Sequence, residues 1–406
     1  MKSLHYILIL CALVVSLSTS AATVQLTIGP YEVEAKNHPV VLRLAEYPQF
    51  SEAERAMLGV YVNGREIASQ LDDLNQDGIA DELAFLIDIK KGKRVRVCVK
   101  PAKRHKTFPK EVFAEMYLKS KEPQEGFVPH TAEGKSYYIK PVTEQSFYPG
   151  EDSYHSMHHH GVAFESALMA YRIYFDKKQT IDVYAKKTPR LELDACKWYP
   201  TDEQLAQGFG DDVLRVSGYI GVGTCKPWNG QKMVHFQDKN CTRTQRIVSQ
   251  GCIRTICEVT CCGNEGYANI TTRYTLYARH RDVMAEVFSY SRDSLVTGVQ
   301  RIGEANFYTN HRNLVASFGT AFPVNDSVKY GKETVGLAVY VPEQYTKALV
   351  RDANNNMVLL KALPYVKYFF TVVALKENNP PARTDGDFFT FVELWAQELE
   401  KSGLAY

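Results

Sequence analysis

The sequence predicts a mainly β protein, with a smaller N-terminal β domain, a large antiparallel β-sandwich and one C-terminal helix. Alternating or β-branched apolar segments recur along the chain between Gly, Pro, Asn and Asp residues, which is the pattern of strands and turns. The last stretch, GDFFTFVELWAQELEKSG, instead spaces its apolar residues as a helix does. We expect Asp385 or Asp387 to cap this helix and Trp395 to lie in the core.

The chain begins with a leader-like segment, MKSLHYILILCALVVSLSTSAATVQ. One lysine precedes an apolar run, and small residues follow, as in a secretory signal peptide. We therefore expect residues 1–21 to be removed and the protein to be periplasmic or secreted. The apolar run is too short to cross a bilayer, and no other segment approaches about 18 uninterrupted apolar residues, so no membrane span is predicted.

The overall charge is nearly balanced, with 48 Lys and Arg residues against 46 Asp and Glu residues. This balance gives no reason to expect a nucleic acid or an acidic membrane as a partner. Nine cysteines occur, of which Cys11 lies in the leader and five lie between Cys241 and Cys262. Export favours a local set of disulfides there, and a zinc site is the alternative.

Residues 22–101 are rich in predicted strands, and one turn among them has a second interpretation. The segment QLDDLNQDGIADE (70–82) places side-chain oxygens at every second position before a glycine, like the first half of an EF-hand-type loop. The twelfth position of that motif is Ala84 instead of Glu. The segment is therefore either a hairpin turn or a structural calcium site. The calcium ligands would be Asp73, Asn75, Asp77 and Asp81, and no other cofactor is expected.

Residues 102–150 carry fewer apolar residues than their neighbours. We expect a short amphipathic helix from Pro109 to Lys119, followed by a linker. The predicted domains are thus residues 22–145, an N-terminal β-rich domain with its linker, and residues 146–406, the β-sandwich.

The most informative stretch is YHSMHHHGVAFESALMAYRIYFDKKQTIDVYAK (154–186). It holds four histidines in six residues. The alternation from Arg172 to Tyr184 predicts two strands joined by a turn at Asp176–Gln179. Arg172, Tyr174 and Asp176 would share one face of the first strand. Asp212 precedes a later strand, and Trp228 follows a run of glycines.

Two runs, HGVAFESALMAYRIYFDKKQTIDVYAK and GFGDDVLRVSGYIGVG, resemble DUF4861, a bacterial domain family of unknown function. The family form reads HGPAFESELVGYRIYFD, then IDIFGK, then WGMDVLKVGxSLGxGG. Val162, Ala185, Phe209 and Asp211 depart from it, and the polar positions are kept. The resemblance covers most of the chain and implies an exported β-sandwich protein of glycan-degrading bacteria, without an established reaction. By analogy at the level of the fold, the sandwich is a supersandwich of the galactose-mutarotase-like kind.

The residues of the central stretch suit an enzyme acting on uronate-containing or substituted oligosaccharides by lyase- or dehydratase-type elimination. His160 or His158 would exchange a proton near neutral pH, and Tyr171 or Tyr174 would deliver one. Arg172 would hold the uronate carboxylate with two parallel hydrogen bonds.

Two alternatives stay open. Glu165 with Asp176 or Asp212 would supply the carboxylate pair of a glycoside hydrolase. A non-catalytic glycan-binding protein would use the same residues as a binding surface, with the histidines in a loop or on a metal. In each case the expected sugar contacts are Tyr174, Lys186 and Trp228. No GxSxG, GxGxxG, HExxH or P-loop motif occurs.

Overall fold

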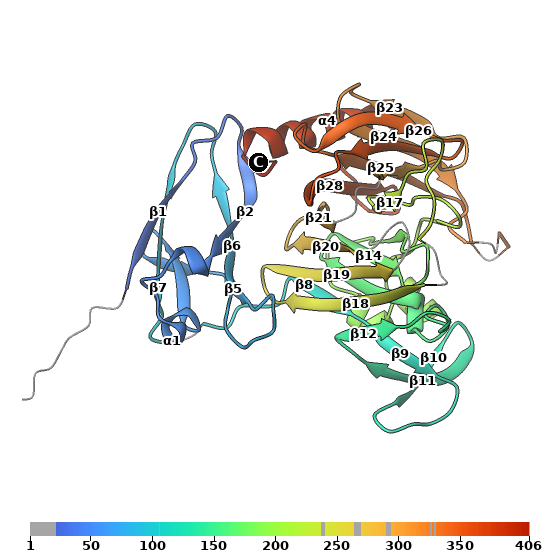
Figure 1. Cartoon of the computed structure of the whole chain (residues 1–406), viewed down its shortest axis with the longest axis horizontal. Coiled ribbons are helices and arrows are strands. Elements are labelled where there is room, and N and C mark those ends of the chain that lie inside the picture. Colours follow the sequence, from blue (N-terminus) through green and yellow to red (C-terminus); the bar gives the residue numbers. More distant parts are fainter. Residues whose placement is uncertain are drawn as a thin grey trace, which may run out of the picture.

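A computed structural model describes residues 22–104, 106–236, 240–263, 269–289, 294–324, 327–328 and 330–405. The expected leader, residues 1–21, lies outside these ranges. The described residues form six β-sheets and few helices, arranged as a small N-terminal body beside a larger sandwich (Figure 1). The mainly β fold expected from the alternating segments is confirmed. Within the described residues, no helix has both the length and the apolar character that a membrane crossing requires.

The N-terminal body packs two small sheets around a core of its own. The core includes Leu44, Leu58, Phe85 and Val99, all nearly inaccessible to solvent. The first sheet has the order β1 (Val24–Ile28), β7 (Val95–Pro101), β3 (Leu58–Val62) and β4 (Arg65–Ile67). The second has the order β2 (Ala35–Arg43), β6 (Glu82–Ile89) and β5 (Ser69–Asp72), and the short helices are η1 (Leu44–Glu46) and α1 (Glu52–Arg55).

One sheet of nine antiparallel strands forms the larger layer of the sandwich. Its inner face carries apolar residues at every second position, as in β20, where Tyr274 and Leu276 are buried in the main core. In spatial order the strands are β12 (Glu144–Phe147), β18 (Cys241–Gln250), β19 (Arg254–Gly263), β20 (Ile270–Tyr277), β21 (Val283–Ser289), β28 (Tyr365–Ala374), β25 (Glu333–Tyr340), β24 (Leu314–Ala321) and β23 (Asn306–Thr309).

Two further sheets cover the inner face of the nine-stranded sheet and close the sandwich. Their residues, such as Val162, Tyr171 and Val358, belong to the same core cluster as the inner face of the large sheet. The first has the order β16 (Asp211–Asp212), β15 (Ile181–Ala185), β14 (Met169–Tyr174), β13 (Gly161–Ser166) and β8 (Val112–Glu115). The second has the order β17 (Lys226–Pro227), β22 (Leu295–Gln300), β27 (Asn355–Leu360) and β26 (Thr346–Arg351).

The prediction of a helix at Pro109–Lys119 is wrong, because this segment forms strands. Pairing of β8 with β13 buries Val112 and Ala114, which a helix on the surface would leave in water. The expected linker likewise forms strands, and the boundary near residue 145 stays a prediction. The small sheet of this region has the order β10 (Val128–Ala132), β11 (Lys135–Pro141) and β9 (Tyr117–Ser120).

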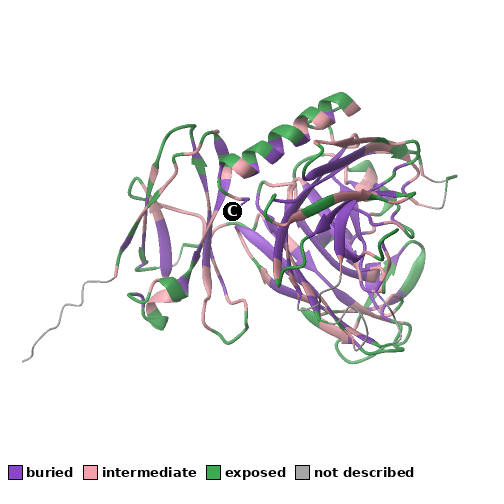
Figure 2. Cartoon of the chain, turned by 45° about the horizontal axis from the view of Figure 1, so that its top comes forward, coloured by how far each residue is buried: buried purple, intermediate pink, exposed green. Residues whose placement is uncertain are grey.

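The C-terminal helix is confirmed as α4 (Asp385–Lys401), and it packs on the outer face of the nine-stranded sheet (Figure 2). Trp395 is 9% exposed and lies in the cluster between the helix and the sheet, as expected. The N-cap in the structure lies one residue before Asp385, the earlier of the two expected caps. Thr384 is the N-cap, and Asp387 completes the capping box from the third helical position.

The eight cysteines beyond the leader are free thiols in the structure. Cys241, Cys257 and Cys261 are buried and fill the core beside apolar side chains, whereas Cys262 is exposed because its direction on β19 is opposite. The expected local disulfide set is therefore not formed.

Candidate functional site

Strand pairing brings four of the residues singled out in the sequence to one face of the five-stranded sheet. Ala163 lies opposite Arg172, and Arg172 lies opposite Asp182. In the next row, Glu165 lies opposite Ala170, and Tyr184 lies opposite Asp212. Since alternate residues of a strand share a face, this outer face carries Glu165, Arg172, Tyr174, Asp182, Tyr184 and Asp212.

Two short segments with unusual backbone conformations cover this outer face. One is η2 (His158–His160), and the other contains α2 (Leu193–Cys196) and α3 (Asp202–Ala206). Four non-glycine residues in these segments have positive φ: His159 (40°), His160 (64°), Lys197 (47°) and Trp198 (73°). Such conformations cost about 1–3 kcal/mol each and concentrate at functional sites. These two segments, called the cover below, are therefore candidates for part of a functional site.

Arg172 organises the centre of the face. Its Nε donates to Asp182 Oδ1 over 3.1 Å, and its Nη2 donates to the hydroxyl of Tyr174 over 2.8 Å. The guanidinium also lies 4.4 Å from the ring centroid of Trp198. The side chain is only 3% exposed. Asp182 takes the Nε–Nη2 edge of the guanidinium, and Tyr174, Tyr199 and Asp212 contact its Nη atoms, so Arg172 orients these neighbours.

Two carboxylates share this one guanidinium. Asp212 Oδ2 lies 3.3 Å from Arg172 Nη2, and Asp182 holds the same group more closely. Burial and the charge of Asp182 raise the pKa of Asp212 well above its ordinary value, although Arg172 acts in the opposite direction. Asp212 also keeps 17% of its side chain exposed, so it is the carboxyl of the pair that holds a proton more readily than usual and still reaches solvent.

His160 is held in one tautomer at the edge of the same network. Its Nδ1 lies 2.9 Å from the carbonyl oxygen of Tyr154, so Nδ1 carries the hydrogen and Nε2 keeps its lone pair. The imidazole stacks on the ring of Tyr154 at 3.9 Å and 8°, with the ring of Tyr174 at 6.0 Å. Burial, together with the charge of Arg172, lowers the pKa of His160 to about 3. The residue is therefore a neutral base at neutral pH.

The two preceding histidines are buried and differ in their contacts. The Nδ1 of His158 pairs with the hydroxyl of Tyr137 at 2.8 Å, and its Nε2 donates to the carbonyl oxygen of Lys197 at 3.0 Å. Burial lowers the pKa of His158, so it stays neutral and ties the two covering segments together. His158 therefore supports the structure of the cover, whereas we expected from the sequence that it could act as a base.

His159 has no hydrogen-bond partner for either ring nitrogen among the described residues. Its Nε2 lies 3.5 Å from Glu115 Oε1, which is also unpartnered in the described part of the chain. Burial raises the pKa of Glu115 to about 8. Unpartnered buried polar atoms of this kind are rare in folded proteins, and they gather here beside the strained cover.

Glu165 and Lys186 form a buried ion pair next to this cluster. The ammonium of Lys186 contacts Glu165 and donates to the carbonyl oxygens of Ser166 at 2.6 Å and Arg190 at 2.7 Å. Glu165 accepts the backbone N–H groups that begin α2, at Glu192 and Leu193. The pair thus anchors the cover and has no side-chain surface left for a sugar.

The remaining predicted residues lie away from the Arg172 network. Tyr171 faces the sandwich core, where its hydroxyl donates to the carbonyl oxygen of Arg281, so it is not available as a proton donor. Asp176 accepts the N–H groups of Lys178 and Gln179 in the turn after β14, and Trp228 packs against a separate small cluster.

The loop after β5 has the contacts of a turn. Asp73 accepts the N–H groups of Gln76 and Gly78, and Asp81 accepts that of Leu74. The carboxylates are directed at the loop's own backbone, which favours the turn interpretation over calcium. In the ranges that the structure describes, no three His, Cys, Asp or Glu side chains gather so as to hold a metal ion.

The sequence missed four members of the site. Asp182 is an alternate residue of the predicted second strand, so its position opposite Arg172 could have been found. Glu115 lay in the segment expected to be a helix. Trp198 and Tyr199 come from a stretch without periodicity, and no sequence signal indicated that they cover Arg172.

The sequence profile of a family described as "Domain of unknown function (DUF4861)" matches residues 29–402. No curated protein sequence matches the chain.

Two solved structures share a partial likeness with the chain. One, described as a protein in the glycosyl hydrolase family 38 from Enterococcus faecalis, is 10% identical, with a TM-score of 0.42, and the match covers 93% of this chain and 46% of that one. The other, described as an alpha-mannosidase from Enterococcus faecalis V583, is 8% identical, with a TM-score of 0.37, and the match covers 93% and 45%. The chain thus spans about half the length of these structures.

Proposed function

The chain belongs to the DUF4861 family, and from this premise we propose that it acts on uronate-containing oligosaccharides by elimination at the outer face of the five-stranded sheet. The family resemblance gives the carbohydrate setting, and the chemistry comes from the residues of the face. One observation carries the proposal: the partly exposed His160, with a lone pair on Nε2, lies beside Tyr174, and Tyr174 contacts Arg172, which also contacts the partly exposed Asp212, whose pKa is raised.

The reaction needs a base, an acid and a group that stabilises the carboxylate of the sugar. His160 Nε2 takes the proton from C5 of the uronate, the electron pair forms the C4–C5 double bond, and the C4–O bond breaks. Asp212 gives its proton to the leaving oxygen. The products are an unsaturated uronate and a new hydroxyl group, and no redox partner is required.

The rim offers groups that can touch a substrate. His160, Tyr174, Tyr199 and Asp212 are partly exposed, whereas Arg172 and Asp182 are buried. Arg172 Nη1 donates to the hydroxyl oxygen of Tyr199 over 3.4 Å, which leaves the hydroxyl hydrogen free to point at a sugar carboxylate. The negative charge of a bound uronate would raise the low pKa of His160 and so strengthen it as a base.

An absorbance screen tests the proposal. The full protein is incubated with oligosaccharides of galacturonate, mannuronate, guluronate and glucuronate, and the products are read at the ultraviolet band of unsaturated uronate and by mass. His160→Ala is run beside His155→Ala, a matched control, because His155 is exposed and pairs with Asp152 outside the network. Absorbance that is lost only in His160→Ala supports elimination. Shorter products without absorbance would favour hydrolysis, and binding without products would favour a glycan-binding protein.

A further inference from the structure

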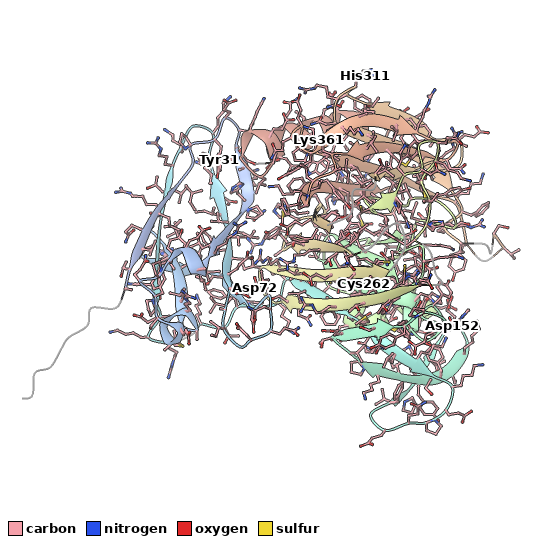
Figure 3. All side chains as sticks on the ribbon, in the orientation of Figure 1. Tyr31, Asp72, Asp152, Cys262, His311 and Lys361 are labelled. Carbon is pink, nitrogen blue, oxygen red and sulfur yellow. The ribbon has the colours of Figure 1, made fainter. Side chains whose placement is uncertain are left out.

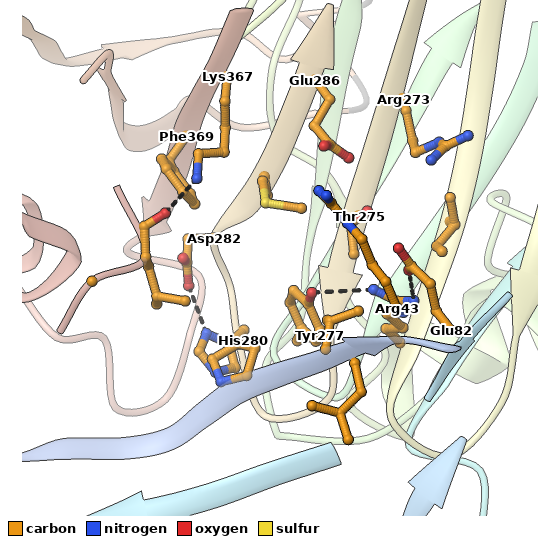
Figure 4. A pocket seen from close by; sticks show the side chains of 18 of the residues that line it. Arg43, Glu82, Arg273, Thr275, Tyr277, His280, Asp282, Glu286, Lys367 and Phe369 are labelled. Atoms are coloured by element: carbon orange, nitrogen blue, oxygen red, sulfur yellow. Dashed lines mark hydrogen bonds and ion pairs between the residues drawn. The ribbon is translucent and has the colours of Figure 1, made fainter. Parts of the chain in front are cut away.

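A second concave region lies between the N-terminal body and the outer face of the nine-stranded sheet. It is a cleft of about 730 Å³, which is in the size range of ligand sites. One wall is the segment from Pro39 to Tyr47, the floor comes from β19, β20, β21 and β28, and Gly403 and Leu404 close one side (Figure 4). None of the Arg172 network lines it. Figure 3 shows Asp152, two residues before Tyr154, on the side of the sandwich away from the N-terminal body.

The floor of the cleft carries charges of alternating sign in one row across the strands. Strand register places Glu258 opposite Arg273, Arg273 opposite Glu286, and Glu286 opposite Lys367. Neighbouring strands are about 4.8 Å apart, so donors and acceptors repeat at that interval. Figure 4 shows Arg273, Glu286 and Lys367 side by side along the floor.

Each charged group of the row has a partner. Arg273 Nε donates to Glu258 Oε1 over 2.8 Å, and Lys367 donates to the carbonyl oxygen of Leu404 over 2.8 Å. Glu286 Oε1 accepts the hydroxyl of Tyr365 over 2.8 Å. The row is therefore ordered without a ligand, and Arg273, Glu286 and Lys367 line the cleft.

The two walls are held at a fixed separation by buried contacts below the cleft. Arg254 of β19 pairs with Asp72 of β5 at 2.7 Å, and Gln70 Oε1 accepts the N–H of Ile253 at 2.9 Å. In Figure 3, Asp72 lies where the N-terminal body meets β18 and β19. His280 Nε2 donates to the carbonyl oxygen of Asn37 over 2.9 Å at the other side. The cleft is thus formed in advance of binding.

The charge balance of the lining selects the kind of ligand. Among the described residues that line the cleft, four cations and His280 stand against four carboxylates, so the cleft carries little net charge that would attract a phosphate or a polyanion. An apolar ligand would displace water from these charged groups without replacing its hydrogen bonds. A hydroxyl-rich ligand both donates and accepts, and can pack its sugar rings on aromatic side chains. The lining cations and carboxylates are Arg43, Arg254, Arg273, Lys367, Glu46, Glu82, Asp282 and Glu286, and the aromatic residues at the rim are Tyr47, Phe288 and Tyr365.

We propose that this cleft binds an uncharged oligosaccharide chain, at a site separate from the His160 centre. The chain lies across β19, β20, β21 and β28, with its hydroxyl groups on the row of alternating charges. The proposed binding does not depend on the elimination reaction, and binding measurements alone test it.

Calorimetry with the full protein tests the cleft. The probes are cellohexaose, xylohexaose, mannohexaose and maltohexaose as uncharged chains, and inorganic phosphate as the charged comparison. We expect at least one uncharged hexasaccharide to bind, and Glu286→Gln to weaken it about tenfold. The same variant removes the carboxylate between Arg273 and Lys367, so its affinity for phosphate relative to the hexasaccharide should rise.

Three further variants keep the test decisive. Arg43→Ala, whose side chain is 75% exposed and cannot unfold the core, should also weaken the hexasaccharide. Glu343→Gln, exposed and outside the cleft, and His160→Ala should leave it unchanged. The proposal is overturned if no uncharged hexasaccharide binds, or if binding survives in Glu286→Gln and Arg43→Ala but is lost in His160→Ala.

Discussion

Tyr154 holds His160 in two ways at once: its ring lies flat against the imidazole at 3.9 Å, and its carbonyl oxygen takes the Nδ1 hydrogen at 2.9 Å. The stack fixes the plane of the imidazole, and the carbonyl fixes its tautomer. A lone pair on Nε2 is then available at a constant position beside Tyr174. The proposed base is thus oriented by the residue that begins the histidine-rich stretch.

Replacing Tyr154 separates these two effects. Tyr154→Ala keeps the carbonyl and removes the ring, so His160 should keep its tautomer and become less buried. Because burial is the main cause of its low pKa, we expect the pKa of His160 to rise from about 3 towards its ordinary value. Nuclear magnetic resonance titration of the imidazole nitrogens measures this. An unchanged pKa in Tyr154→Ala would show that burial under the ring is not the cause.

The buried Glu165–Lys186 pair should matter for stability and not for chemistry. Lys186→Met leaves the Glu165 carboxylate buried without its cation, and we expect a loss of about 3–5 kcal/mol in the free energy of unfolding. The double variant Glu165→Gln, Lys186→Met should recover part of that loss. Urea denaturation measures both. A loss in the double variant that equals the sum of the losses in Lys186→Met and Glu165→Gln would contradict a coupled pair.

The contact of His280 with the N-terminal body should weaken at high pH. Burial lowers the pKa of His280, but Asp282 and the two hydrogen bonds outweigh it and raise the pKa above the ordinary value. A raised pKa in the folded state means that the contribution to stability is complete below about pH 6.5 and is lost as the pH rises through the folded value.

The measurement is the unfolding free energy of the wild type and of His280→Gln at pH 6 and pH 9. The difference between the two proteins should be larger at pH 6. His155→Gln, an exposed histidine, is the matched control and should show little difference at either pH. A difference for His280→Gln that is larger at pH 9 would reverse the assigned sign.

Alternation along β14 predicted two of the three residues expected on the outer face, whereas Asp176 lies in the turn after the strand. Arg172 and Tyr174 were expected together, and the structure adds Asp182 from the paired strand. The same alternation places Tyr171 in the core, because neighbouring residues of a strand face opposite sides of the sheet. The prediction of Tyr171 as a proton donor did not apply this rule.

The rest of the site depends on contacts between segments far apart in the sequence. Glu115 reaches His159 because β8 pairs with β13, and the low apolar content of its neighbourhood indicated a helix instead. Trp198 covers Arg172 through a turn with positive φ at a residue that is not glycine, which no local pattern predicts. Tertiary contacts decided both cases.

Replacing the carboxyl group of Asp212 should slow departure of the leaving group. In Asp212→Asn the amide cannot donate as an acid, and we expect the rate of unsaturated product formation to fall about 100-fold or more. Asp202→Asn, an exposed carboxyl in the first turn of α3, is the matched control, because no contact described here joins Asp202 to Arg172 or Asp212. Similar losses in both variants would argue against a specific role for Asp212.

Exchange of the sugar C5 hydrogen with deuterated water tests the central claim most directly. The substrate found by absorbance is incubated in deuterated water with Asp212→Asn and with His160→Ala, and the C5 signal is followed by nuclear magnetic resonance. If His160 is the base and Asp212 the acid, Asp212→Asn should exchange the C5 hydrogen without releasing product, and His160→Ala should do neither. Continued exchange in His160→Ala would contradict the account, because another group would then remove the proton.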